Sequence, residues 1–372
     1  MKYDFGQLKE KYNAFQYPAV SVAVEGKAIG TNRAGLIVGS MKVELTSGTE
    51  ASTSVFRIYG CVEEEGSYKT DVLKTFVSLG SKCSVSIGYE GNLTEVFRGL
   101  LVRTAFVCDE EGIPCVEAEA MDIKGMMMAN AHVKQLRAKK YGEAVKEILS
   151  FPVYQAMESG GILESAQIGA TPEYGEGARI DMVSESDYEF VVKAAKKFHY
   201  EFFTDVGKLY FREARKSAPP LIEIGNGKGL LDYQIEYDLR GLVREVEARG
   251  VDDERGERIA ARKKQKNKVS FGNKADRFLS GTEKVVVDDA IRTKEEAGMR
   301  AEAVLKDISY RYGRLECSTI GLPEIKPGTS VALSGLGKGA DNEFYVTSVS
   351  HVISEEEGFR TRITGEAAQL KG

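Results

Sequence analysis

The stretch Gly80-Ser-Lys-Cys-Ser-Val-Ser-Ile-Gly88 has a counterpart of similar pattern near the other end of the chain, Gly328-Thr-Ser-Val-Ala-Leu-Ser-Gly335. Aligning Gly112 with Gly358 gives an offset of 246 residues (358 minus 112), and the register slips by one or two residues on either side. Self-similarity of this kind predicts a supersecondary unit that is used twice. The later parts of the first copy are Val96-Phe-Arg-Gly-Leu-Leu-Val102, Asp109-Glu-Glu-Gly-Ile113 and Glu119-Ala120, and those of the second are Glu343-Phe-Tyr-Val-Thr-Ser-Val349, Glu355-Glu-Glu-Gly-Phe359 and Glu366-Ala367.

Both copies have the pattern of antiparallel β structure. Cys83, Val85, Ile87 and Tyr89 alternate with small or polar residues, and after a turn at Glu90-Gly91-Asn92 an apolar run extends over 96–107. Alternation on both sides of a glycine-containing turn predicts a hairpin. The acidic segments at 109–112 and 354–358 lie between strand-like runs and are predicted to be turns as well.

Further strands are predicted ahead of the first copy. Val20, Val22 and Val24 alternate with smaller residues, Met41, Val43 and Leu45 do the same, and a third run covers 55–61. Together these supply enough strands for a small closed barrel or a sandwich, which needs about seven or eight. Apolar residues at helical spacing within 71–79 predict one short helix packed against that barrel.

The middle of the chain has a different pattern. A short helix is predicted over 141–149, and Ser186-Asp-Tyr-Glu189 is a capping box that opens a second helix before a hairpin at 200–212. Thr293-Lys-Glu-Glu296 is another capping box, and it opens a helix ahead of the second copy. The predicted fold class is α+β, mainly β, with a tube-like antiparallel barrel at 1–122, a helix-plus-hairpin module at 123–230 and a second barrel with one helix at 231–372.

The composition is typical of a globular chain. The 372 residues suffice for two to three domains, 42% of them are hydrophobic, and the formal net charge is −5. No apolar run approaches the roughly 18 residues of a membrane span, and the start lacks a signal-peptide core. The five cysteines are odd in number and lack metal-ligand spacing, so buried thiols are predicted; they are Cys61, Cys83, Cys108, Cys115 and Cys317.

Several motifs resemble chemical sites and have simpler explanations. Gly225-Asn-Gly-Lys-Gly229 and Gly335-Leu-Gly-Lys-Gly339 lack the ending of a phosphate-binding loop and are predicted to be turns. The paired acids Glu63-Glu-Glu65 and Glu355-Glu-Glu357 would suit a glycosidase only if they flanked one cleft, and at turn positions they are predicted to be solvated. The three histidines show no metal-ligand or nucleophile spacing; they are His132, His199 and His351.

Two further segments could contact partners. The basic run Arg258 to Lys268 has no interleaved aromatic residues, and the chain as a whole is acidic, so a solvent-exposed or protein-docking loop is predicted rather than a nucleic-acid site. Met126-Met-Met128 is predicted to be adaptable packing at a domain junction, with a soft docking surface as the alternative. We therefore predict no catalytic residues, no cofactor and no metal.

The order of elements over nearly the whole chain resembles a known family, and the motifs that carry the likeness lie in the second half. Ser186-Asp-Tyr-Glu-Phe190, Phe198-His-Tyr-Glu-Phe-Phe203 and Gly207-Lys-Leu-Tyr-Phe211 are similar to the central module of phage tail baseplate hub proteins (late control protein D-like) and of the hub half of VgrG spike proteins. Other segments resemble the strand that opens the second barrel of these hubs and their closing segment: Val243 to Gly250 with Val251-Asp-Asp253, Glu295-Glu-Ala297, Gly321 to Val331 and Phe344 to His351.

The resemblance implies a homotrimer whose two barrels per chain alternate around a central channel. It implies a spike or tip protein below, a tail tube or tube-initiator protein above, and the tape measure protein as a further partner. The expected location is the baseplate of a virion, or of a phage-tail-like particle such as a bacteriocin, assembled in a bacterial cytoplasm. Because the chain ends at Gly372 without an OB-fold or spike, the spike is expected to be a separate polypeptide. A tail-associated cell-wall hydrolase is the alternative.

Overall fold

The two similar stretches form the same three-stranded antiparallel meander. A computed structural model describes residues 3–30, 35–108, 112–171, 179–216, 219–252, 256–266, 274–288 and 291–371. The turn residues 109–111 predicted above lie outside this part. The first meander is β5 (Lys82–Tyr89), β6 (Asn92–Cys108) and β7 (Pro114–Met121), and the second is β19 (Ser330–Ser334), β20 (Asn342–Ser354) and β21 (Gly358–Ala367).

The duplication extends beyond the meanders to six strands in each half. The first unit has the order β1-β5-β6-β7-β4-β3, and the second unit has the corresponding order β13-β19-β20-β21-β18-β14. One pairing differs, because β1 runs antiparallel to β5 whereas β13 runs parallel to β19. The remaining strands are β1 (Pro18–Val24), β3 (Ile37–Thr46), β4 (Thr53–Tyr59), β13 (Ile222–Gly225), β14 (Leu230–Tyr237) and β18 (Gly313–Ile320), and β2 (Lys27–Ala28) extends the sheet beyond β1.

Irregularities in the ladders fix which residues correspond. The β6·β7 register skips Val102, and the β20·β21 register skips Thr347, which gives an offset of 245 (347 minus 102). The β3·β4 register skips Gly39 and the β14·β18 register skips Leu231 at the matching place. A bulge is a specific device that bends a strand, so two shared bulges support a real duplication. The offset of 246 from the sequence pattern is wrong by one, because it equates Gly112 with Gly358, whereas the offset of 245 on both strands of the hairpin makes Ile113 the counterpart of Gly358.

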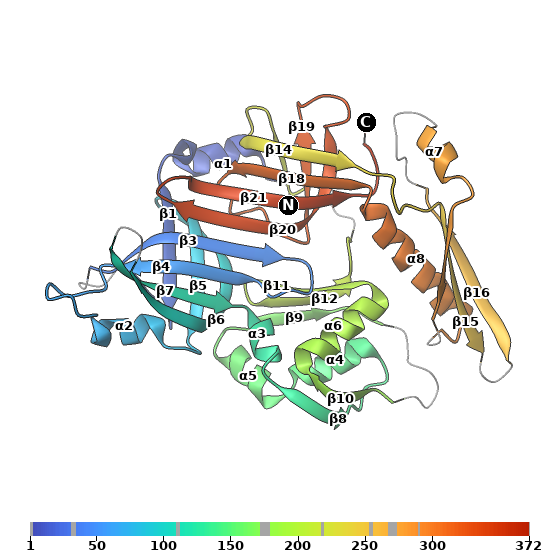
Figure 1. Ribbon diagram of the computed structural model, residues 1–372, viewed down its shortest axis with the longest axis horizontal. Helices are drawn as coiled ribbons and strands as arrows, with labels where there is room; N and C mark the ends of the chain where they lie inside the picture. Colours follow the sequence, from blue (N-terminus) through green and yellow to red (C-terminus); the bar gives the residue numbers. More distant parts are fainter. Residues whose placement is uncertain are drawn as a thin grey trace.

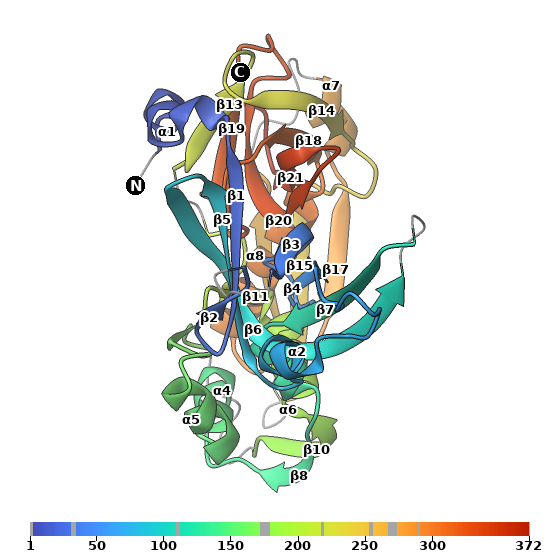
Figure 2. The ribbon, with the colours of Figure 1, turned by 90° about the vertical axis from the view of Figure 1, so that its left-hand side faces the viewer.

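The two units are joined edge to edge in a single sheet (Figures 1 and 2). The first part of β20 pairs with β19 and its last part, from Ser348 to Ile353, pairs antiparallel with β3. The sheet therefore runs from β14 through β20 and β3 to β6, β5 and β1 without closing on itself. The α+β, mainly β class is confirmed. Among the described residues the two predicted tube-like barrels do not close separately, because the outer strand of the first unit pairs with the second unit.

One hydrophobic core serves both units. Val43, Phe56 and Val85 of the first unit and Val331 and Phe344 of the second are almost fully buried in it. The predicted helix α2 (Thr70–Val77) packs Leu73 and Phe76 into the same core, as does Leu8 of α1 (Phe5–Lys11), which is followed by the 3₁₀ turn η1 (Asn13–Phe15).

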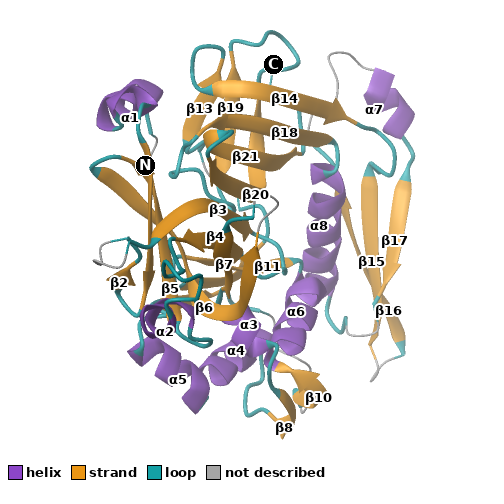
Figure 3. Ribbon diagram, turned by 60° about the vertical axis from the view of Figure 1, so that its left-hand side comes forward, coloured by secondary structure: helices purple, strands orange, loops and turns teal. Residues whose placement is uncertain are grey.

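The middle module has its own core of residues between Leu100 and Phe211. Both reciprocal bonds of the predicted capping box are present at Ser186 and Glu189, and the predicted hairpin is β11·β12. In Figure 3 the helices of this module lie at the end of the molecule away from β14. Its elements are α3 (Ile123–Met127), β8 (Ala131–Gln135), α4 (Tyr141–Leu149), α5 (Pro152–Ser159), β9 (Ser165–Ile168), β10 (Asp181–Ser186), α6 (Asp187–Phe198), β11 (Tyr200–Asp205) and β12 (Lys208–Glu213).

An insertion between β14 and β18 carries the remaining elements and a third small core. The second capping box, at Thr293 and Glu296, is also formed. The basic run is a strand rather than the predicted loop, because residues 257–264 pair with β15; Lys268 lies outside the described residues. The elements are β15 (Glu245–Asp252), β16 (Glu257–Lys264), α7 (Lys274–Leu279), β17 (Glu283–Val287) and α8 (Lys294–Tyr310).

Candidate functional site: a polar groove and two open strand edges

One face of the second unit carries rows of polar side chains across several strands. In one row Glu316, Thr364 and Ser348 lie directly opposite each other, and in the next row Ser318, Arg362 and Ser350 do so. The row containing Ser348 continues to Thr46, and the row containing Ser350 continues to Glu44, both across the β20·β3 junction. Because side chains alternate across a strand, these residues project away from the apolar core.

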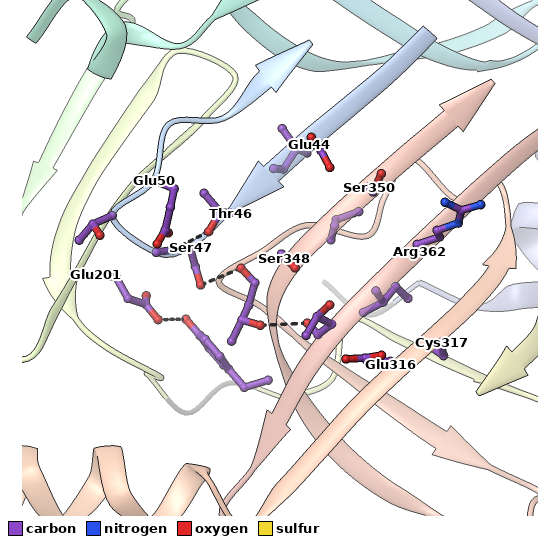
Figure 4. Close-up of a pocket in the computed structure, with 18 of the residues that line it drawn as sticks. Glu44, Thr46, Ser47, Glu50, Glu201, Glu316, Cys317, Ser348, Ser350 and Arg362 are labelled. Atoms are coloured by element: carbon purple, nitrogen blue, oxygen red, sulfur yellow. Dashed lines mark hydrogen bonds between the residues drawn. The ribbon is translucent and has the colours of Figure 1, made fainter. Parts of the chain in front are cut away.

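The polar rows line an open groove of about 1110 Å³. Figure 4 shows Glu44, Ser348, Ser350 and Arg362 along it, with Glu50 and Glu201 at one end. The groove is therefore bounded by both units and by the middle module. Polar lining of this kind suits a water-filled passage or a protein contact better than an apolar ligand.

A network of hydrogen bonds fixes the end of the groove at the middle module. The Tyr345 hydroxyl donates to Glu201 Oε1 at 2.5 Å, and the Arg212 Nε donates to Glu201 Oε2 at 3.2 Å. Burial, together with the nearby Glu201 carboxylate, raises the pKa of Tyr345. Arg215 then links Glu366 of β21 to Asp307 of α8 through its guanidinium. Four separate parts of the chain are thus held together at this end.

The corresponding face of the first unit carries an ion triad instead. Glu117 accepts from Arg103 Nη1 at 2.9 Å and from Arg57 Nε at 3.2 Å. Hydrogen bonding to Arg103 lowers the pKa of the Glu117 carboxyl. The two units therefore share strand order while presenting different chemistry on the same face.

On the path β14-β18-β21-β20-β3-β4-β7-β6, the first strand and the last part of the final strand each have an unpaired edge among the described residues. β14 pairs with β18 on one side, and no strand lies along its other side. β5 pairs with β6 only as far as Leu100, so residues 101–108 of β6 have a strand on the β7 side alone. Such edges are templates for another strand. Sequence patterns did not indicate them, because alternation shows that a strand exists and not what lies beside it.

The structure places the three histidines in three different elements. His351 is fully buried with its Nδ1 2.9 Å from Thr361 Oγ1, and burial lowers its pKa to about 3. His199 ends helix α6, and burial, with nearby Arg300, lowers its pKa to about 4. His132 Nε2 is 3.6 Å from Asp187 Oδ1. Each is a packing or capping residue of a different element.

Four of the cysteines are buried as predicted, and Cys108 is exposed at the end of β6. Burial raises the pKa of the Cys83 and Cys317 thiols to about 12, which makes them poor nucleophiles. The prediction of buried thiols is wrong for Cys108, because β6 runs past its neighbour β5.

The remaining candidate motifs lie in turns, a helix and a strand. The Gly225–Gly229 segment is a turn in which Lys228 pairs with Glu223, and Gly337 and Gly339 adopt positive φ in the other glycine motif. Among the paired acids, Glu63 to Glu65 are exposed, and Glu357 accepts from Arg362. Within Met126–Met128, Met127 is buried and Met128 is exposed.

The basic strand β16 is paired with acidic residues. Arg258 and Arg262 of β16 both contact the Glu247 carboxylate of β15. Arg249, which is also on β15, contacts the same carboxylate. These guanidinium groups, Arg249 first, lower the pKa of Glu247 to about 2. Lys263 pairs with Glu302 of α8. The positive charge of this run therefore holds the insertion together.

In the described ranges, no group of three or more His, Cys, Asp or Glu side chains is arranged to hold a metal ion. None of the helices in the part of the chain that the structure covers is long and apolar enough to span a membrane.

Residues 18–355 match the family described as Alg8 N-terminal domain. The chain belongs to this family. The match begins at the first residue of β1 and ends just after β20, so it includes every strand of both units except β21. The family description states a domain and no activity. No curated protein matches the chain in sequence.

Solved structures of tail proteins share the fold. A tail protein from Neisseria meningitidis MC58 aligns with a TM-score of 0.66 at 16% identity, over 95% of this chain and 97% of that one. The 43 kDa tail protein of prophage MuSo2 from Shewanella oneidensis gives 0.65 at 14% identity, over 94% and 98%. The E. coli c3393 protein, described as a type VI secretion component similar in structure to the T4 tail proteins gp27 and gp5, gives 0.55 at 8% identity, over 94% and 77%.

Proposed function

We propose that this protein is a structural hub of a phage tail or phage-tail-like contractile particle. The observation that supports the proposal most is the duplication, since one chain carries the same six-strand unit twice and has open strand edges at β14 and along the last part of β6. The shared fold with tail and type VI secretion proteins agrees with this role.

Symmetry supplies the physical reason for a duplicated unit. A tail tube is built of six-fold rings, whereas a spike is a trimer. Three chains with two similar units each provide six similar positions around one axis. A homotrimer of this chain would therefore present near-six-fold symmetry to the tube and three-fold symmetry to the spike, through heterologous contacts that close into a ring.

The remaining parts of the proposal follow from that role. The partners are a spike or tip protein on one side and a tail tube or tube-initiator protein on the other, with the tape measure protein as a further contact. The protein would reside in the baseplate and have no enzymatic activity. We also propose the division into 1–122, 123–230 and 231–372, although β13 of the second unit begins before residue 231.

Measurement of mass in solution tests the proposal. Light scattering after gel filtration, with and without the cognate spike protein, should give the mass of three chains in at least one condition. Electron micrographs of that species should show a ring with three lobes and a central hole. A monomeric or dimeric mass in both conditions would contradict the hub.

The hydrolase alternative has a separate test. A zymogram on peptidoglycan should show no clearing at the position of the purified protein. Clearing that persists through purification, and that disappears when Glu44 and Glu316 in the groove are changed to glutamine, would favour an enzyme.

A further inference from the structure

We propose that residues 103–108 of β6 in one chain pair with β14 of a second copy, in the antiparallel register that β20 and β3 use within each chain. The inference rests on the proposed ring and adds the strands, the register and the residues that close it. Its starting point is that one junction between units is already visible inside the chain.

The two shared bulges show which residues are equivalent in the two units, so the β20·β3 register can be applied to the open edges of β6 and β14. Within the chain Ser348 lies opposite Thr46, His351 opposite Val43 and Ile353 opposite Met41. Counting from the bulges at Val102 and Thr347, and from those at Gly39 and Leu231, gives the corresponding pairs between chains. These are Arg103 opposite Asp238, Phe106 opposite Ile235 and Cys108 opposite Tyr233.

Hydrogen bonds show that the open edge of β6 begins at the same place as the paired edge of β20. The Leu101 N–H donates to Ser81 O at 2.9 Å, and the Gly80 N–H donates to Leu101 O at 2.8 Å. At the corresponding place the Val346 N–H donates to Thr329 O, and the Gly328 N–H donates to Val346 O. Beyond this point β20 receives β3, and β6 receives no strand among the described residues.

Burial differs at the corresponding positions in the way that a missing partner predicts. His351 and Val43 are fully buried and Met41 is 3% exposed at the junction within the chain. At the open edges Phe106 is 58% exposed and Tyr233 is 47% exposed, although both lie on the core-facing side of the sheet. Phe106 contacts Tyr68 edge to face at 4.8 Å, so its ring already has one apolar neighbour.

The charges at the two edges are complementary in this register. Arg103 would lie opposite Asp238, and opposite charges across a strand pair are favourable. Within the chain Arg103 already contacts Glu117, and Asp238 already contacts Arg240. The proposed pairing would therefore bring two ion pairs together. A slip by one residue would place Arg103 opposite Tyr237 and turn Phe106 and Ile235 to opposite faces.

The pairing joins β6 of one chain to β14 of the next. Because these are two different edges, the contact is head to tail and can close into a ring. Each chain contributes the eight strands β14-β18-β21-β20-β3-β4-β7-β6 to the path around the ring. Three chains joined head to tail would leave no edge of this path open, which is how closed sheets avoid aggregation.

A disulfide between chains tests the register with one substitution. The Tyr233→Cys variant would place a thiol opposite the native, exposed Cys108, at a separation that suits a disulfide. Mild oxidation should give covalent dimers and trimers on a non-reducing gel, and peptide mass analysis should show a 108–233 linkage. The Met41→Cys/Ile353→Cys variant is the matched control, because it should form the corresponding disulfide within one chain.

The outcomes separate this inference from the hub itself. A trimeric mass with no linkage at 108–233, while the control disulfide forms, would overturn the pairing and leave the hub standing. Equal or better linkage through Gln234→Cys would overturn the register. A monomer with and without the spike would overturn both proposals.

An edge charge provides an independent measurement. Phe106→Lys should weaken assembly at least tenfold, because it places a charge in the expected apolar contact. Phe278→Lys on α7 is the matched control, since Phe278 is 67% exposed and lies on neither edge. Both variants should have the thermal stability of the original monomer. Equal assembly of the two variants would count against the proposed pairing.

Discussion

Val102 and Thr347 occupy equivalent positions in the two units. Val102 of β6 is the bulge residue without a partner in the ladder with β7, and Thr347 of β20 is the bulge residue without a partner in the ladder with β21. The residue before each bulge accepts a backbone hydrogen bond from a glycine with positive φ. Gly80 donates to Leu101 O in one unit, and Gly328 donates to Val346 O in the other. Positive φ is readily adopted by glycine and costs other residues about 1–2 kcal/mol. Corresponding glycines in different surroundings therefore allow a controlled comparison.

Gly328→Ala should destabilise the protein more than Gly80→Ala. A Cβ at position 80 would meet nothing within 4 Å, so only the conformational cost of about 1–2 kcal/mol is expected. A Cβ at position 328 would lie 2.7 Å from Phe203 Cζ and 2.8 Å from Arg212 Nη2, which adds about 1–3 kcal/mol of overpacking. Urea unfolding of the two variants measures the difference, and equal losses would contradict it.

Lys124→Met should lower the free energy of unfolding by about 2–4 kcal/mol. The Lys124 side chain is buried, and its Nζ donates to the backbone oxygens of Gly48 and Glu50 in the β3–β4 turn. Burial lowers the pKa of this amine. Methionine fills similar space but leaves those oxygens without their donor. Lys74→Met is the control, because Lys74 is exposed and should change stability by no more than about 0.5 kcal/mol.

His351→Phe should flatten the dependence of stability on pH. The pKa of His351 is about 3 in the fold and about 6.5 when unfolded, so below pH 6.5 the unfolded chain binds a proton that the fold does not. Stability then falls by about 1.4 kcal/mol per pH unit for this group between pH 6.5 and about 3. Denaturant titrations at pH 7.5, 6 and 5 should show the smaller slope in the variant. Parallel profiles for variant and original would exclude this role.

Tyr12→Phe should loosen helix α1 while leaving the rest of the fold intact. The Tyr12 hydroxyl donates to Glu324 Oε1 at 2.6 Å, and Lys11 Nζ donates to the same oxygen at 2.9 Å. Removing one donor to a buried carboxylate costs about 1–2 kcal/mol. Hydrogen exchange of the α1 amides should speed up accordingly, whereas Tyr17→Phe, an exposed position, should leave it unchanged. Unchanged exchange in Tyr12→Phe would show that α1 is held by packing alone.

Local patterns in the sequence were sufficient for several of the elements. Alternation at Cys83, Val85 and Ile87 identified β5, and the capping boxes at Ser186 and Thr293 identified the starts of α6 and α8, because these signals depend on neighbouring residues only. The duplication was visible for the same reason, since both copies need the same alternation and turns. Its offset was wrong by one, because Gly112 and Gly358 are not equivalent and glycines in turns are poor markers of equivalence.

Tertiary structure alone decided which strands became neighbours. Val43 and His351 are opposite each other across a junction between residues some 300 positions apart, and that choice depends on backbone hydrogen bonds and shared burial that no local pattern encodes. The same holds for Arg258, which the sequence placed in a loop and the fold placed in a strand beside Glu247. The polar groove and the open edges of β6 and β14 arise from this pairing. The sequence by itself determined the elements that have a local signal, and long-range pairing decided that the basic run is a strand, where each segment lies and which edges remain open.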